Sequence, residues 1–404
     1  MTSSSGPAPS ALRCWLGLAG FYATTFATLG AYMVFFPGWL KSAGEFSADE
    51  LSVVLAAQTI ARTGFGPFWA HRVDRAGGPR GILVALAFAS VAAFALFGVR
   101  AGMGFAFVAA FLFGSVYSPM FPIVDGAAMQ AASERGFAYG RLRLCGSVSY
   151  LVIVVGLGQC LDRFGHGIVF PVLLATMAAM AVSSLALARA PVRPVAERER
   201  APWWQPLRSR PFVLLLLATA AIQGSHATFY NLSTIHWLDH GISKTWASVL
   251  WAEGILAEIV LFAFARETVD RLRPTTLLLV GGGAAVVRWC VVAVTTSVPL
   301  LLATNWLHAL SFGCTYLGAL RALERRVPAH QRSTAQGLLG AANSGLGMVV
   351  CGVLGGVLYE RWEGRAFFTM AAFAALGAGL AFQLRRMADQ PRIATSSAAS
   401  PKPE

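Results

Sequence analysis

The sequence predicts an all-α membrane protein in which twelve transmembrane helices form two pseudo-symmetric six-helix bundles. Composition, regularly spaced apolar runs and an internal repeat support this prediction. The 404 residues are 56% hydrophobic and only 13% charged, with a mean hydropathy of +0.60, whereas soluble domains carry about 25% charged residues. A chain with this composition cannot be solvated as one soluble core.

Apolar runs of roughly 20 residues recur along the chain, and each is long enough to cross about 30 Å of hydrocarbon. In the first half the runs lie at 14–38, 50–70, 80–99, 103–130, 142–161 and 168–188. In the second half they lie at 211–238, 245–265, 275–297, 300–321, 334–359 and 366–385. The predicted divisions are a disordered tail 1–11, a bundle 12–189, a cytoplasmic linker 190–210, a bundle 211–387 and a disordered tail 388–404.

The basic residues indicate the orientation. If the amino terminus is cytoplasmic, only six of the 32 Lys and Arg residues fall outside: Lys41, Arg100, Arg163, Lys244, Arg361 and Arg365. The positive-inside rule favours this arrangement. We therefore expect a monomeric, multi-pass protein of the bacterial inner membrane with both termini cytoplasmic. The net charge of +13 lies in short loops and not on one soluble face, so it predicts no nucleic-acid partner.

Six cysteines stand singly in or beside apolar runs, without a CxxC motif. They are typical of small packing residues. The sequence predicts neither a metal site nor a cofactor.

Short motifs recur between the two halves. Val73-Asp74-Arg75 reappears 196 residues later as Val269-Asp270-Arg271. Asp162-Arg163 before the last span of the first half resembles Glu360-Arg361 before the last span of the second. These matches indicate a duplication, and two six-helix halves around a central cavity are the architecture of many secondary transporters.

Charged residues inside the spans are few. Each costs roughly 2.5 to 3.5 kcal/mol at a helix centre, so each requires a partner, water or a function. The ionisable residues within predicted spans include Arg62, Asp125, Arg143, Glu253, Glu258, Arg288 and His308.

Distances along each hairpin place several of these groups at similar depths. Asp125 and Arg143 lie nine residues either side of Glu134, about 13 Å above the cytoplasmic turn, so we expect them to pair. A purely structural ion pair is the alternative. Arg62 is at least as consistent with a structural role.

Arg288 and His308 lie ten residues either side of the outer turn at Val298, near the midplane, which favours a functional role for His308. His226 and Glu258 lie sixteen residues either side of Ile242. These depths predict one middle layer of ionisable groups, where a cavity between the halves binds substrate.

Other candidates have two interpretations. His226 and His236 fit a packing role as well as ligand contact. Trp237, Trp251 and Trp289 are able to stack on a ring-bearing substrate, although membrane aromatics often pack or lie at the interface.

The segment from His71 to Gly77 is interpreted as a tight charged turn containing Asp74 and Arg75. A solvated loop is the alternative. Its repetition at Asp270-Arg271 favours a gating latch formed by both copies.

These residues together resemble the major facilitator superfamily, and within it the phenylpropionic-acid porter group related to lactose permease and nucleoside:proton symporters. The resemblance covers all twelve spans. Its most specific stretches are Trp39-Leu40-Lys41, Tyr139-Gly140-Arg141-Leu142-Arg143 with Gly146-Ser147, Gln223-Gly224-Ser225-His226-Ala227, Ala257-Glu258, Val287-Arg288-Trp289 and Leu307-His308. In the post-span loop, Ala70 replaces the superfamily's usual first glycine.

The resemblance implies site roles. Asp125 and Arg143 match a carboxylate and an arginine at the substrate site of lactose permease, and Glu258, Arg288 and His308 match its substrate and proton-coupling groups. With the candidates Gln223, His226 and Trp251 added, the expected substrate-binding set is Asp125, Arg143, Gln223, His226, Trp251 and Arg288, and the proton-coupling set is Glu258, His308 and Asp125. Ser311 stands where lactose permease has an acidic proton carrier, which leaves Glu258 or the Asp125 pair as the expected proton site.

The expected function is proton-coupled symport of a small aromatic carboxylic acid such as phenylpropionate, by alternating access. A sugar or nucleoside symporter of the same fold is the alternative. An enzyme would require a nucleophile with its base or a metal cluster, and no His, Asp or Cys spacing supplies one. A receptor or scaffold would more naturally carry a soluble domain or a long loop.

Overall fold

The computed structural model describes residues 11–76, 78–137, 139–188, 204–264, 271–327 and 331–389. Across these residues the regular structure is helical, which confirms the predicted all-α fold. Eight helical stretches of the described chain are long and apolar enough to cross a membrane, and one of them, Thr334–Met387, contains two of the predicted spans.

The first half contains six membrane-length helical segments. They are α1 (Ala11–Gly44), α2 (Ala48–Arg75), α3 (Pro79–Ala95) with a 3₁₀ turn Leu96–Val99, α4 (Met103–Tyr117) followed by α5 (Met120–Arg135), α6 (Tyr139–Phe164), and α7 (Val169–Ser184) after a 3₁₀ turn His166–Ile168. One span divides into α4 and α5 at Pro119, which has no N–H to continue the helical ladder.

The second half has more interruptions. Its helices are α8 (Arg210–Gly224), α9 (Ala227–Asp239), α10 (Lys244–Phe264), α12 (Pro274–Val294), α13 (Val298–Asn305), α14 (Thr315–Arg326), α15 (Arg332–Gly340), α16 (Met348–Trp362) and α17 (Phe367–Asp389). A 3₁₀ turn Gln205–Arg208 precedes α8, and another at Glu363–Ala366 precedes α17. Two π-helical turns, Ala309–Cys314 and Ala341–Gly347, precede α14 and α16 respectively. Such turns are rare and frequently lie at functional sites.

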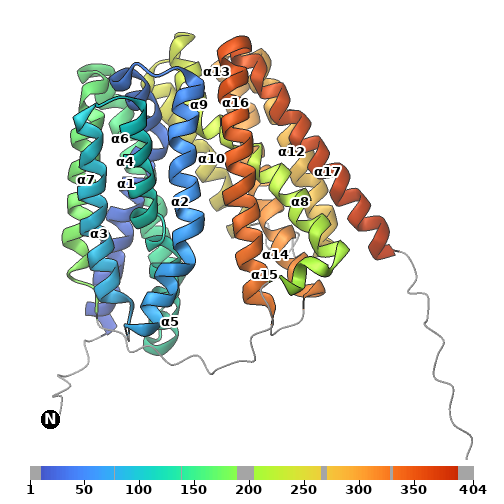
Figure 1. Cartoon of the computed structure of the whole chain (residues 1–404), viewed down its shortest axis with the longest axis horizontal. Helices are drawn as coiled ribbons and strands as arrows, with labels where there is room; N and C mark the ends of the chain where they lie inside the picture. Colours follow the sequence, from blue (N-terminus) through green and yellow to red (C-terminus); the bar gives the residue numbers. More distant parts are fainter. Residues whose placement is uncertain are drawn as a thin grey trace, which may run out of the picture.

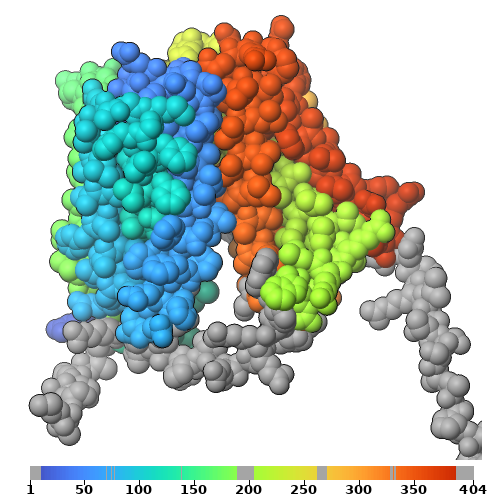
Figure 2. All heavy atoms as spheres, in the orientation of Figure 1, coloured from blue at the N-terminus to red at the C-terminus, as the bar shows by residue number. Residues whose placement is uncertain are grey.

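The two halves stand side by side, as Figure 1 shows, and they meet at the upper end of that view. There α2 packs against α16, and α6 packs against α10. The halves separate toward the lower end, where Figure 2 shows a hollow between their surfaces. We call these the closed end and the open end. The first described residues of α1 and α8 lie at the open end.

The expected turn at 71–77 requires a correction, because residues 71–75 continue α2 as helix. Asp74 and Arg75 therefore lie in the last turn of α2, not in a loop, and the N–H of Ala76 caps that turn by donating to the carbonyls of Arg72 and Val73. Gly77 and Asp270 lie outside the described residues. The latch that they would form with Arg271 stays a prediction.

The predicted boundaries of the tails, bundles and linker also stay predictions. Residues 1–10, 189–203 and 390–404 lie outside the described part of the chain.

Glycines permit close helix contact in the second half. A Cβ at Gly281 of α12 would overlap the hydroxyl of Thr315 in α14, whereas one at Gly283 on the same helix would meet open space. Helix packing at Gly281 therefore leaves no room for a methyl group.

We expect Gly281→Ala to lower the free energy of unfolding by about 1 to 3 kcal/mol, the usual cost of overpacking a core. Gly283→Ala is the matched control, and its higher helix propensity should leave stability unchanged or raised by about 1 kcal/mol. Thermal unfolding in detergent measures both. Equal melting temperatures for the two variants would contradict the packing argument.

Candidate functional site

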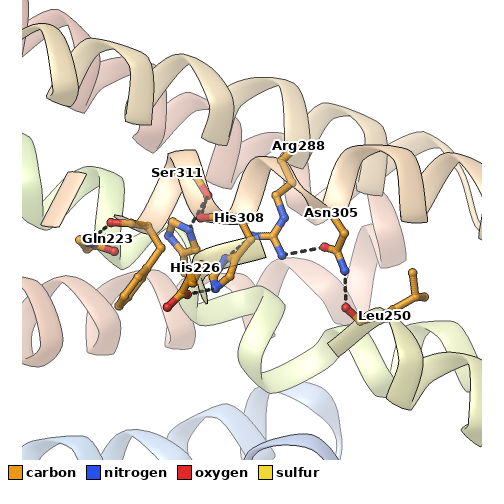
Figure 3. Close-up of polar contacts among 9 residues, drawn as sticks. Gln223, His226, Leu250, Arg288, Asn305, His308 and Ser311 are labelled. Atoms are coloured by element: carbon orange, nitrogen blue, oxygen red, sulfur yellow. Dashed lines mark hydrogen bonds and ion pairs between the residues drawn. The ribbon is translucent and has the colours of Figure 1, made fainter. Parts of the chain in front are cut away.

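A buried polar cluster lies in the second half, where α10, α12, α13 and the π-helical turn after His308 meet. Arg288 of α12 is only 1% exposed. Its Nη1 lies 3.0 Å from Nδ1 of His308, and its Nη2 donates to Oδ1 of Asn305 at 2.9 Å (Figure 3). Asn305 in turn donates to the carbonyl of Leu250 in α10 at 2.5 Å. His308 also reaches α10, because its Nε2 lies 2.8 Å from the Glu258 carboxylate.

These contacts determine which nitrogen of His308 carries a proton. A guanidinium only donates hydrogen bonds, so Nδ1 of His308 must accept from Arg288. The neutral ring then has its proton on Nε2, which donates to the Glu258 carboxyl group. A second proton on His308 would set two N–H groups against each other and break the contact with Arg288.

His226 lies beside these hydrogen-bonded side chains, and its ring centre is 5.8 Å from that of His308. Its Nδ1 donates to the Ile222 carbonyl at 3.1 Å, so its Nε2 accepts from Ser311 at 3.1 Å (Figure 3). Ser311, which stands where lactose permease has an acidic proton carrier, thus forms a hydrogen bond with His226. Gln223 donates to the Phe312 carbonyl at 3.3 Å.

Aromatic rings surround the same cluster. The Arg288 guanidinium lies 4.4 Å from the ring centre of Phe229 and 4.8 Å from that of Trp289. Trp251 lies against Phe229 and Tyr230, and its indole N–H donates to Thr234 at 2.9 Å. Guanidinium and ring faces attract each other at such distances.

A second cluster lies in the first half. Asp125 accepts hydrogen bonds from the hydroxyls of Tyr22 and Tyr139, the second at 3.1 Å. The Arg143 guanidinium lies over the Phe26 ring at 4.2 Å, and that ring stacks on Tyr22.

The expected direct pair between Asp125 and Arg143 is not formed in this conformation. Across the described residues, no carboxylate lies within 4.0 Å of the Arg143 guanidinium. Two tyrosine hydroxyls donate instead to one oxygen of Asp125, Oδ1. Asp125 and Arg143 therefore lie in one aromatic cluster without forming an ion pair.

Two of the remaining candidates, Arg62 and His236, have structural partners. Arg62 donates across the halves to the carbonyl of Ser344 in a π-helical turn. His236 bonds the Tyr359 hydroxyl at 2.9 Å and packs on Phe367, which favours packing. Asn305, Tyr22 and Tyr139 are partners that the sequence analysis did not assign. A polar residue inside an apolar run was the available signal for Asn305.

Two bundles of membrane-length helices, each with a cluster of ionisable side chains, closed at one end and separated at the other, have the architecture of a membrane transporter. Residues 15–370 match the MFS_1 like family, and the chain belongs to that family.

Named relatives agree with this class. The chain is 26% identical over 365 residues to a "Probable 3-phenylpropionic acid transporter" of Escherichia coli (strain K12), covering 89% of this chain and 94% of the relative. It is also 26% identical over 350 residues to a "Maltose permease" of Geobacillus stearothermophilus, covering 85% and 87%.

Solved structures show the same fold. A mutant of the nucleoside transporter NupG matches with a TM-score of 0.81 at 13% identity, covering 93% of this chain and 99% of that one. An inward-facing, unoccupied bacterial homologue of human lysosomal Spinster matches with a TM-score of 0.73 at 14% identity, covering 94% and 98%.

Asn305→Ala should lower the free energy of unfolding by about 1 to 3 kcal/mol, because it leaves a buried guanidinium N–H of Arg288 without its acceptor and removes the bond to the Leu250 carbonyl. Substrate uptake should fall as Arg288 loses its orientation. Thr304→Ala is the matched control, since Thr304 bonds only carbonyls of its own helix among the contacts described. Melting temperature and uptake in proteoliposomes measure both effects, and equal values for the two variants would contradict this role.

Proposed function

We propose that this protein is a secondary active transporter that couples proton movement to symport of a small aromatic carboxylic acid by alternating access. The chain Glu258–His308–Arg288 carries the proposal, because it joins a carboxylate to a buried cation through a titratable ring. The proton and the substrate are the proposed partners of the protein.

The coupling of proton and substrate movement follows from the charges of Glu258, His308 and Arg288. Ionised Glu258 and Arg288 balance each other through His308. A proton on Glu258 removes the negative charge and leaves the cation to attract an anionic cargo. When the site holds both the anionic cargo and the proton, it carries less uncompensated charge in the state in which both ends of the transporter are closed. An empty site without its proton restores the original balance.

The cargo is inferred from charge and lining. Within the predicted spans, three guanidiniums, Arg62, Arg143 and Arg288, accompany three carboxylates, Asp125, Glu253 and Glu258. Among the described residues no carboxylate lies within 4.0 Å of the Arg143 guanidinium, so this cation is able to bind an anion. Of the side chains that the structure describes, two in the second-half cluster keep a buried polar atom without a partner. These atoms are the acceptor Oε1 of Gln223 and the donor Nε of Arg288.

The lining supports an aromatic ring on that anion. Phe26 lies under Arg143, and Phe229 and Trp289 lie against Arg288, so both clusters combine a cation with ring faces. The Escherichia coli relative, a probable 3-phenylpropionic acid transporter, supports the same class of cargo.

A sugar or nucleoside is the second candidate cargo. The maltose permease relative has the same 26% identity, and Tyr22, Tyr139 and Gln223 are able to bond hydroxyl groups. Counterflow in proteoliposomes with aromatic acids, sugars and nucleosides distinguishes the candidates.

We also propose a monomer in the bacterial inner membrane with both termini cytoplasmic. The concentration of Lys and Arg in loops on one side supports this orientation. The open end, where α1 and α8 begin, then faces the cytoplasm.

Glu258→Gln should keep substrate exchange but lose uphill accumulation driven by a pH gradient, because the amide imitates the protonated acid permanently. Glu253→Gln, on the same helix and nearer the closed end, is the matched control and should retain accumulation. Counterflow and gradient-driven uptake are measured in the same vesicles. Equal loss of both activities in Glu258→Gln would assign Glu258 to binding or folding, and full accumulation would move the proton site to Asp125 or His308.

Arg143→Gln should weaken transport of an aromatic acid by about ten- to hundredfold in kcat/KM, the range for one charge-assisted hydrogen bond. Transport of the neutral amide of the same acid should change little. Arg141→Gln, two residues earlier on α6 and exposed, is the matched control. Equal losses for acid and amide would show that Arg143 does not recognise the carboxylate.

A further inference from the structure

The motif repeated at Asp162 and Glu360 forms contacts at the closed end that the transport site does not use. Asp162 stands near the end of α6 and faces the start of α10 in the other half. One carboxylate oxygen accepts from the backbone N–H of Lys244 at 3.0 Å. The other accepts from the N–H of Thr245 at 2.9 Å and from its hydroxyl at 2.5 Å. The carboxylate therefore caps a helix that belongs to the opposite half.

Glu360 makes the corresponding contact in the opposite direction. It stands near the end of α16 in the second half, and its carboxylate accepts from the backbone N–H of Ala48, the first residue of α2 in the first half. Ala48 and Lys244 are 196 residues apart, the same separation as the repeated Val-Asp-Arg motif. Both copies of the duplicated chain thus offer a carboxylate to the other copy's helix start.

The helix starts are also equivalent. A serine precedes each one, Ser47 before Ala48 and Ser243 before Lys244, and each serine hydroxyl accepts from the backbone N–H three residues later. Each start therefore presents its remaining N–H groups, with the positive end of the helix dipole, to a carboxylate from outside.

Glycines bring the helices close enough for this contact. Gly158 stands four residues before Asp162, and Gly356 stands four residues before Glu360. A Cβ at Gly158 would overlap the side chain of Ser248, and one at Gly356 would overlap that of Ser52. Ser52 and Ser248 occupy equivalent places, five residues after the capping serines.

Two further contacts join the halves at this end. The Lys244 ammonium donates to the carbonyl of Leu161 at 3.0 Å, and the Lys41 ammonium lies 3.5 Å from the Asp239 carboxylate. Both Lys41 and Asp239 are substantially exposed, so their ion pair contributes little. The carboxylate caps, which bond backbone N–H groups and face a helix dipole, are the stronger candidates for holding the end closed.

We propose that Asp162 and Glu360 are symmetry-related positioning residues that hold this end of the transporter closed and so set the ratio between its two access states. Their bonds exist only while the halves meet, because each carboxylate and its helix start belong to different halves. Each cap therefore stabilises one state and not the other, which is the requirement for shifting a population. The proposal rests on the proposed alternating access, but not on the cargo or the proton.

The test measures the separation of the halves directly. In a chain whose six native cysteines are replaced, spin labels at Arg163→Cys and Arg361→Cys, both exposed at the closed end, report the distance between halves in liposomes without substrate. Asp162→Ala and Glu360→Ala should each raise the ratio of long to short distances by roughly fivefold, as expected for one lost helix cap. The double variant should raise it by roughly twenty-five-fold, because the two sites are independent.

Asp49→Ala is the matched control. It removes a carboxylate from the first turn of α2, but that carboxylate bonds Ser47 in its own half. Asp162→Asn and Glu360→Gln keep one acceptor oxygen and should shift the ratio by about twofold, less than alanine; they carry the test if the alanine variants do not fold. Unchanged distances in the cap variants, or an equal shift in Asp49→Ala, would overturn the proposal. Uptake by the parent chain tests the proposed function separately, since the distance measurement requires no transport.

Discussion

The second half is organised by the need to satisfy one buried cation. Arg288 is a guanidinium with almost no exposure, inside a bundle whose outer surface faces hydrocarbon. Leaving such a charge without partners costs about 3 to 5 kcal/mol, so its acceptors fix the arrangement of their helices. Asn305 at the end of α13 and His308 before the π-helical turn both bond it, and both also reach α10, through Leu250 and Glu258.

The first half holds its acid and its base by different contacts, and there Arg143 is exposed and Asp125 only partly buried. Asp125 is bonded by tyrosine hydroxyls, and Arg143 lies against a ring, so neither charge depends on the other. Hydroxyl and ring contacts are weaker than an ion pair and more easily exchanged for ligand contacts. The second half thus holds a bonded network, and the first half an acid and a base that do not contact each other.

Much of the fold follows from composition, because a hydrocarbon environment requires runs of about 20 apolar residues in helical conformation. Depth within a hairpin also follows from counting residues, and it correctly grouped Arg288 with His308. Counting gives height along a helix but not rotation about its axis, so it placed Asp125 and Arg143 at one level without showing that their side chains face different neighbours.

Interruptions of helices were the least predictable features. Pro119 offered a signal for the break between α4 and α5, but the π-helical turns at Ala309–Cys314 and Ala341–Gly347 depend on contacts made after the helices pack. The stretch 71–75 was interpreted as a turn from its charges, although charged residues are equally compatible with the exposed last turn of a helix, which is what they form. The partners of Arg288 and Asp125 required knowledge of which spans are neighbours.

The reciprocal contacts at the closed end have the geometry of an isologous dimer interface. In such an interface a surface meets its own copy, so every contact between one element and another occurs twice with the roles exchanged. Asp162 on the start of α10 and Glu360 on the start of α2 are such a pair within one chain. Two separate copies of one half, each with one carboxylate and one capped helix start, would form both contacts by pairing with each other, so this interface needs no residue that differs between the halves.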